Sequence, residues 1–260
     1  MKKLLYTLTL LTHFTLAATP EQIEQYLSVS NSEEELLSLQ SQFSSMQNSF
    51  KSQENNASDD NTYDMQMLSI RFKEYLQSHL SDDEMTEILQ NYANVVLLQF
   101  VAAESEAQAH DRKEISTYVQ TLKNNPESAI RIELVSKISK ALYSKEAMVV
   151  MFDELMKPLM ENGIGGQKMD AKMLKGVREN YLKMMIEASK RETLYASKDF
   201  TMEELEELLK VAQTPAIEHE TKAAFGAMAY ALKEFFMSLT SRFDVSKHQP
   251  KGTEKIKHTK

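Results

Sequence analysis

Methionine is the residue type with the clearest chemical potential in this chain. Eight of the 16 methionines lie between Met148 and Met185, several of them three or four residues apart, as on one face of a helix. Thioether sulfur binds cuprous ion and lines grooves for apolar partners, but methionine is also a strong helix former and a tolerant core residue. Core packing, a partner groove and a copper site are therefore three hypotheses. The groove would be lined by Met148, Met151, Met156, Met160, Met184 and Met185.

The ionisable residues form no recognisable catalytic or metal-binding motif. No two of the six histidines are four residues apart, and there is no His-Glu-x-x-His motif. In Glu218-His219-Glu220, adjacent side chains of a helix point about 100° apart, so we expect a solvated helix face and not an acid–base cluster. The sequence therefore predicts no catalytic residue, no cofactor and no metal ligand.

Two further stretches look functional but fit helix ends better. The acidic run Glu203 to Glu207 lies at an expected helix start, where the positive helix terminus attracts carboxylates. Gly163-Ile164-Gly165-Gly166 would need a preceding strand to act as a phosphate loop, and a helix is expected there. We interpret it as a helix end at Gly163 followed by a loop.

Composition favours an acidic helical protein with a real core. Of the 260 residues, 42% are hydrophobic, and only 6 Gly and 5 Pro are present, which argues against a turn-rich β fold. The net charge of -8 repels nucleic acid and anionic lipid, so neither is an expected partner. The absence of cysteine excludes disulfides, thiol catalysis and thiolate metal sites.

The first 18 residues have the pattern of a secretory signal peptide. Lys2 and Lys3 form a positive start, an apolar run reaches Leu16, and Thr15-Leu16-Ala17 is a small-residue cleavage site, with cleavage expected after Ala17 or Ala18. The apolar run is shorter than a membrane span, and no later stretch is expected to span a bilayer. Export of a cysteine-free chain suits the bacterial periplasm, where we expect the mature protein.

Helix starts are the most specific signals in the chain. Thr201 followed by Glu204 is a capping box, and Ser81 followed by Glu84 repeats it 120 residues earlier. Pro215 predicts a break between two helices. Further starts are expected at Thr19, Ser32, Ser144 and Asp170, and a kink at Pro158.

The repeated spacing predicts an all-α helical bundle built from two similar multi-helix modules. We place the modules at 19–126 and 127–243, followed by a basic disordered tail at 244–260. The apolar run Val95 to Ala103 could by periodicity be a strand, but helical flanks favour a helix, which we expect to be the central one of the first module and covered on most sides.

Several of these stretches together resemble a known family. They are a Leu-x-x-x-x-Ser-x-x-x-x-hydrophobic helix opening at Leu27 to Leu37, the Phe-Thr-x-Glu-Glu-Leu-x-Glu-Leu-Leu helix from Phe200, and the following Thr-Pro-Ala turn. With the signal peptide, the chain resembles two tandem copies of the secreted bacterial family called domain of unknown function 2059. The resemblance implies an exported helical protein and supplies no activity.

These features lead us to expect a non-catalytic periplasmic protein that binds a protein or hydrophobic segment in a methionine-lined helical groove. An enzyme whose site is assembled only in the fold is the first alternative. Copper handling by methionine is the second. The oligomeric state is not predicted by the sequence.

Overall fold

The computed structural model describes residues 16–51, 63–108, 110–161 and 169–242, and the regular structure in these ranges is helical. This confirms the predicted all-α bundle. The expected signal-peptide start, the Gly163 helix end and the basic tail lie outside the described residues.

The helices are α1 Pro20–Val29, α2 Ser32–Lys51, α3 Gln66–His79, α4 Asp82–Asn91, α5 Val95–Gln108, α6 Arg112–Asn124, α7 Ala129–Leu142, α8 Lys145–Met151, α9 Lys157–Glu161, α10 Ala171–Ala196, α11 Met202–Ala212 and α12 Pro215–Arg242.

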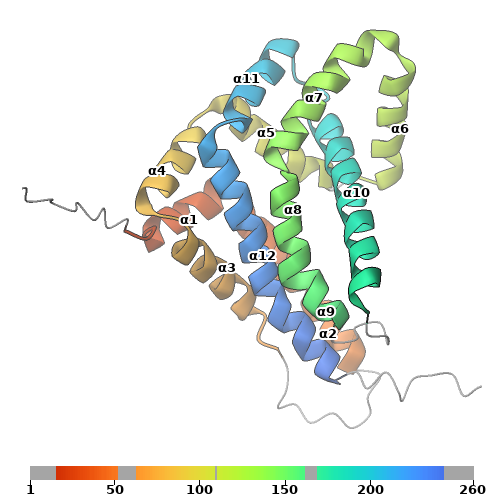
Figure 1. The fold of residues 1–260 in the computed structure, drawn as a ribbon. Helices are drawn as coiled ribbons and strands as arrows, with labels where there is room; N and C mark the ends of the chain where they lie inside the picture. Colours follow the sequence, from red (N-terminus) through yellow and green to blue (C-terminus); the bar gives the residue numbers. More distant parts are fainter. Residues whose placement is uncertain (1–15, 52–62, 109, 162–168, 243–260) are drawn as a thin grey trace, which may run out of the picture.

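The long helix α12 runs through the middle of the bundle (Figure 1). It packs along α3 on one side and along α8 on the other, and it also contacts α4 and α7. Small side chains make this close packing possible, because Ala223, Ala227 and Ala231 are each at most 6% exposed. The helix begins at Pro215, directly after α11 ends, as the proline predicts.

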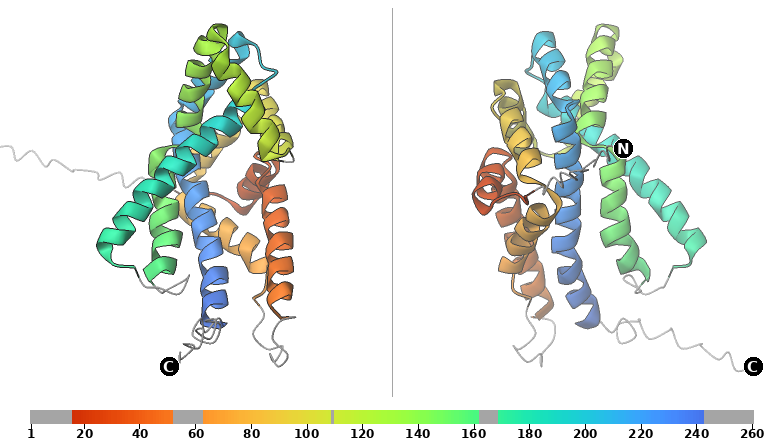
Figure 2. Two further views of the ribbon diagram at one scale, coloured as in Figure 1. Left: turned by 90° about the vertical axis from the view of Figure 1, so that its right-hand side faces the viewer. Right: turned by 60° about the vertical axis from the view of Figure 1, so that its left-hand side comes forward.

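The remaining helices cover one end and one flank of this arrangement. α11 packs on α7 and α5, and α10 packs on α7, α5 and α6. Figure 2 shows α10 inclined to the line of α8 and α9. None of the helices in the described ranges is both long enough and apolar enough to cross a bilayer.

The two predicted modules share one core. A single cluster of buried apolar side chains extends from Ala18 to Phe235 and draws on both halves of the chain. The most extensive contact between two helices of the described residues, that of α3 with α12, joins the two halves as well. The two halves are therefore not packed as separate bodies. A duplication with a boundary at residue 126 stays a prediction about the evolutionary origin of the chain.

Most of the predicted helix starts are confirmed by side-chain hydrogen bonds. Full capping boxes are present at α1, α4 and α11, and simple caps at α8 and α10; the capping residues are Thr19, Ser81, Thr201, Ser144 and Asp170. The kink expected at Pro158 takes the form of a π-helical segment, Phe152–Met156. Proline has no N–H for the usual hydrogen bond, and the helix widens by one residue before it.

Two sequence-based expectations were wrong in detail. Ser32 does not cap α2, because the helix already includes it, and the carbonyl of Asn31 accepts the Glu35 amide. The helix α5 is not covered on most sides, since Val95 is 66% and Leu98 39% exposed. It lies at the edge of the bundle and buries only the face that carries Leu97 and Phe100.

Two helical glycines provide a matched test of the α3–α12 contact. A Cβ at Gly226 would lie 2.4 Å from the Tyr75 hydroxyl oxygen, whereas a Cβ at Gly176 in α10 would have no neighbour within 4 Å. We expect Gly226→Ala to lower the free energy of unfolding by about 1 to 3 kcal/mol through overpacking. Gly176→Ala should raise it by up to about 1 kcal/mol through helix propensity. Urea unfolding followed by circular dichroism measures both, and equal stabilisation by both variants would show that Tyr75 moves aside freely.

Candidate functional site

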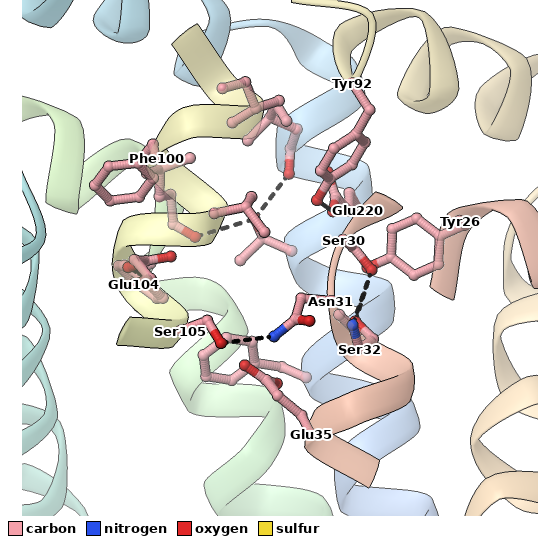
Figure 3. A pocket seen from close by; sticks show the side chains of 18 residues that line it. Tyr26, Ser30, Asn31, Ser32, Glu35, Tyr92, Phe100, Glu104, Ser105 and Glu220 are labelled. Carbon is pink, nitrogen blue, oxygen red and sulfur yellow. Dashed lines mark hydrogen bonds between the residues drawn. The ribbon is translucent and has the colours of Figure 1, made fainter. Parts of the chain in front are cut away.

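A small cavity lies where the α1–α2 turn, α4, α5, the end of α7 and α12 meet (Figure 3). Its volume is about 160 Å³. Apolar side chains of α5 and α12, among them Leu97, Phe100 and Ile217, form part of its wall. The rest of the lining is polar to an unusual degree and includes three glutamates and three tyrosines, namely Glu35, Glu104, Glu220, Tyr26, Tyr92 and Tyr143.

Glu220 of α12 marks the inner end of the cavity. Its side chain is buried, at 8% exposure, and its Oε1 atom accepts a hydrogen bond of 2.5 Å from the Tyr92 hydroxyl of α4. The Oε2 atom is buried and accepts no hydrogen bond of acceptable geometry, although the Tyr26 hydroxyl is near enough to lower the pKa of the carboxyl. Tyr26 of α1 lies beside Tyr92, with the two rings edge to face at 6.1 Å. An unpartnered buried carboxyl oxygen costs about 1 to 3 kcal/mol, so this atom is suited to a hydrogen-bond donor that enters the cavity.

Burial controls the ionisation of this inner group. It raises the pKa of Glu220 to about 7, and the hydroxyls of Tyr92 and Tyr26 lower the pKa by a smaller amount. Burial, together with the negative charge of Glu220, also raises the pKa values of Tyr26 and Tyr92. Both tyrosines therefore stay protonated and can act as donors.

Glu104 and Glu35 form the outer end of the cavity, where side chains are partly exposed. Glu104 of α5 accepts a short hydrogen bond from the hydroxyl of Tyr143, the residue that follows α7. Glu35 of α2 accepts one of 3.2 Å from the Gln108 amide. Although Glu104 is partly exposed, burial raises its pKa to about 8, opposed by the Tyr143 bond and assisted by the charge of Glu35. Burial raises the pKa of Glu35 too.

The α1–α2 turn closes the cavity between these two ends. Asn31 has a φ of 62°, the left-handed conformation that asparagine tolerates better than most residues. Its Nδ2 atom donates to the Ser105 hydroxyl of α5 at 3.1 Å, and Ser30 donates to Ser32 at 2.8 Å (Figure 3). The turn is therefore tied to the opposite wall by a bond between two side chains.

The structure places the six predicted groove methionines in different surroundings. Met148 is buried in the core, Met184 is 64% exposed, and the other four are partly buried. A hollow of about 400 Å³ does lie between the π-helical segment, α9 and α10, but its wall contains none of the six and carries charges such as Asp153, Lys157 and Arg178. The methionine groove stays a prediction.

The solvated helix face predicted for Glu220 was wrong. Glu218 and His219 are on the surface as expected, where they pair with Lys222 and Glu84 respectively. Glu220 instead occupies a core position, because Ala216, Glu220, Ala223 and Ala227 follow one another at four- and three-residue steps along the buried stripe of α12. The signal was present in this spacing, and the comparison of adjacent residues in Glu218-His219-Glu220 could not show it.

Glu104 was missed for a related reason. It follows Leu97 and Phe100 at helical spacing on the buried face of α5, where a carboxylate is unexpected.

Within the described part of the chain, no group of three or more His, Cys, Asp or Glu side chains converges to hold a metal ion.

Comparison with known proteins adds no identification. No protein-family model, no curated protein and no solved structure matches the chain. The resemblance to domain of unknown function 2059 therefore stays a hypothesis that rests on the sequence motifs.

The raised pKa values predict that stability falls as pH rises. Below about pH 4.5, Glu220 is protonated in both the folded and the unfolded chain; above that, the unfolded chain loses the proton while the folded one holds it up to about pH 7. We expect the free energy of unfolding to fall by about 3 kcal/mol on account of Glu220 between pH 4.5 and 8. Glu104 adds to the loss in the same direction.

Urea titrations at pH 5, 6, 7 and 8 measure this effect. Glu220→Gln should remove the part of the loss that is due to Glu220, because the amide does not titrate, and should leave the part due to Glu104. The exposed Glu218→Gln on the same helix should leave the whole loss unchanged. A wild-type protein that is as stable at pH 8 as at pH 5 would contradict the assignment.

Proposed function

We propose that this protein is an exported, non-catalytic binding protein whose acidic cavity takes a small organic cation, for which a primary ammonium group is the minimal ligand. The observation that carries the proposal is the buried carboxyl of Glu220, a residue that lines the cavity and whose Oε2 atom accepts no hydrogen bond. An ammonium group supplies both the hydrogen bond and the positive charge that this atom lacks.

The electrostatic setting favours a cation over a neutral ligand. A buried carboxylate without a counter-charge is costly, which is why Glu220 holds a proton to about pH 7 when the cavity is empty. A bound cation replaces that proton as the compensating charge. The rings of Tyr26 and Tyr92 at the inner end add an aromatic surface, which attracts organic cations more than it attracts neutral molecules.

Binding of 1-butylammonium is the direct test. Isothermal titration calorimetry at pH 6, in two buffers that contain no primary amine and differ in ionisation enthalpy, should detect release of close to one proton per ligand, because Glu220 must ionise to pair. At pH 8.5 the release should be smaller. Glu220→Gln should weaken binding by more than about tenfold, since it removes the buried charge, while Glu218→Gln should bind as the wild type does.

Two outcomes would overturn the proposal. One is the absence of binding by a folded wild-type protein. The other is equal binding by Glu220→Gln, which would place the ligand elsewhere. A calcium chloride titration run in parallel would reveal a metal site, and preference for calcium over the amine would also contradict an organic-cation site.

A general acid–base enzyme is the second candidate function. It is favoured by one observation: the pKa of Glu220, about 7, suits proton transfer near neutral pH, and the Tyr92 hydroxyl lies 2.5 Å from its carboxyl. Ligand recovered unchanged after prolonged incubation with the protein supports binding alone, and chemical conversion of the ligand supports the enzyme.

Export is supported by the sequence of the first 18 residues and is compatible with the local structure. The Ala18 amide donates to the Leu80 carbonyl at 2.9 Å, and Ala18 is 1% exposed, so cleavage after Ala17 keeps this buried residue in the mature chain. We expect the intact mass of protein recovered from the periplasm to correspond to a chain that begins at Ala18. Ala17→Asp, which replaces the small residue at the cleavage site, should leave the precursor uncut. Full-length wild-type chain in the membrane fraction would contradict export by this route.

A further inference from the structure

We propose that the ligand is a linear diammonium compound that spans the cavity, with one ammonium group at Glu220 and the other between Glu104 and Glu35. The inference rests on the proposed binding function and adds the number and spacing of the ligand's charges.

The acidic residues at the two ends of the cavity lie on different helices and have different hydrogen-bond partners. Glu220 on α12 is bonded to Tyr92 of α4, whereas Glu104 on α5 is bonded to Tyr143 after α7. Figure 3 shows Glu220 beside Tyr26 and Tyr92, with Glu104 and Glu35 toward the Asn31–Ser105 bond. The carboxyls therefore form two separate anionic positions in one cavity.

Charge balance then distinguishes one ammonium group from two. A monocation at Glu220 would leave Glu104 with a neutral hydrogen-bond donor, the Tyr143 hydroxyl. A second ammonium group on the same molecule would compensate that carboxyl, and Glu35 beside it adds further negative charge. Two charges on one ligand match the two positions without a second binding event.

The wall between the two ends suits a hydrocarbon spacer. Leu97, Phe100 and Ile217 line the cavity, and each is at most 2% exposed. The volume of about 160 Å³ limits the ligand to a small molecule. A chain of four or five methylene groups between the ammonium ends is therefore the expected size, and the spacer would contact apolar side chains where water would make few hydrogen bonds.

The polar groups of the α1–α2 turn strengthen the outer position. Asn31 and Ser32 line the cavity near Glu35, and the Asn31 side chain is already committed to Ser105 through its Nδ2 atom. Its carbonyl oxygen remains as an acceptor for an ammonium N–H. The outer end thus offers carboxylate and amide oxygens, which all accept hydrogen bonds from an ammonium group.

The test compares 1-butylammonium with 1,4-diammoniobutane and 1,5-diammoniopentane at pH 8 and constant ionic strength, by calorimetry. We expect at least one of the diamines to bind roughly tenfold or more tightly than the monoamine, because a second buried charge pair forms. Glu104→Gln should reduce the affinity for the diamine to that of the monoamine. Glu220→Gln should weaken both.

The outcomes separate the two proposals. Equal affinity for monoamine and diamines, with both lost in Glu220→Gln, would overturn the diammonium inference and leave the proposed function standing. No binding of any amine would overturn both. Circular dichroism and urea unfolding at pH 5 show whether each variant is folded, so that a loss of affinity is not confused with a loss of structure. At this pH the carboxyls of Glu220 and Glu104 are protonated, and the amides that replace them in the variants are uncharged too.

Discussion

The passage of α12 through the middle of the bundle is the constraint on which the other features depend. A helix covered on opposite sides by α3 and α8 must carry small residues where its neighbours approach, and Ala223, Gly226 and Ala227 meet that need. The same buried stripe carries Glu220. Once the helix is fixed by its alanines, the carboxyl is placed inside the protein, and the tyrosines of α1 and α4 are positioned around it.

Under the proposed function, a proton and a ligand cation compete for the same carboxylate. A core that served stability alone would be better filled with an apolar side chain of similar volume, because burial of an ionisable group is costly. The chain instead holds Glu220 in the lining of a cavity, with a hydrogen bond from Tyr92 to one carboxyl oxygen and none to the other. That combination is poor packing for a structural core and good geometry for a site that is filled from solution.

The sequence predicted the elements well and the site poorly, for physical reasons that particular residues illustrate. Contacts within a few residues decide the capping boxes at Thr201 and Ser81 and the helix break at Pro215. These features were therefore predicted correctly from the local sequence. Glu220 could have been found by following the buried stripe of α12. Its hydrogen bond with Tyr92, and the cavity that both residues line, depend on how distant helices cross, which no local pattern encodes. The positive φ of Asn31 likewise follows from the turn between two packed helices.

The bond between Tyr92 and Glu220 joins residues 128 positions apart, and Glu220 lies on the last helix of the described chain. Contacts of such long sequence separation form late in folding, after the local helices. The complete cavity is therefore absent from a fragment that ends before Glu220, because α12 supplies part of its lining. For a protein that is exported before it folds, this order of events would mean that it crosses the membrane empty and acquires its ligand only in the compartment where folding ends.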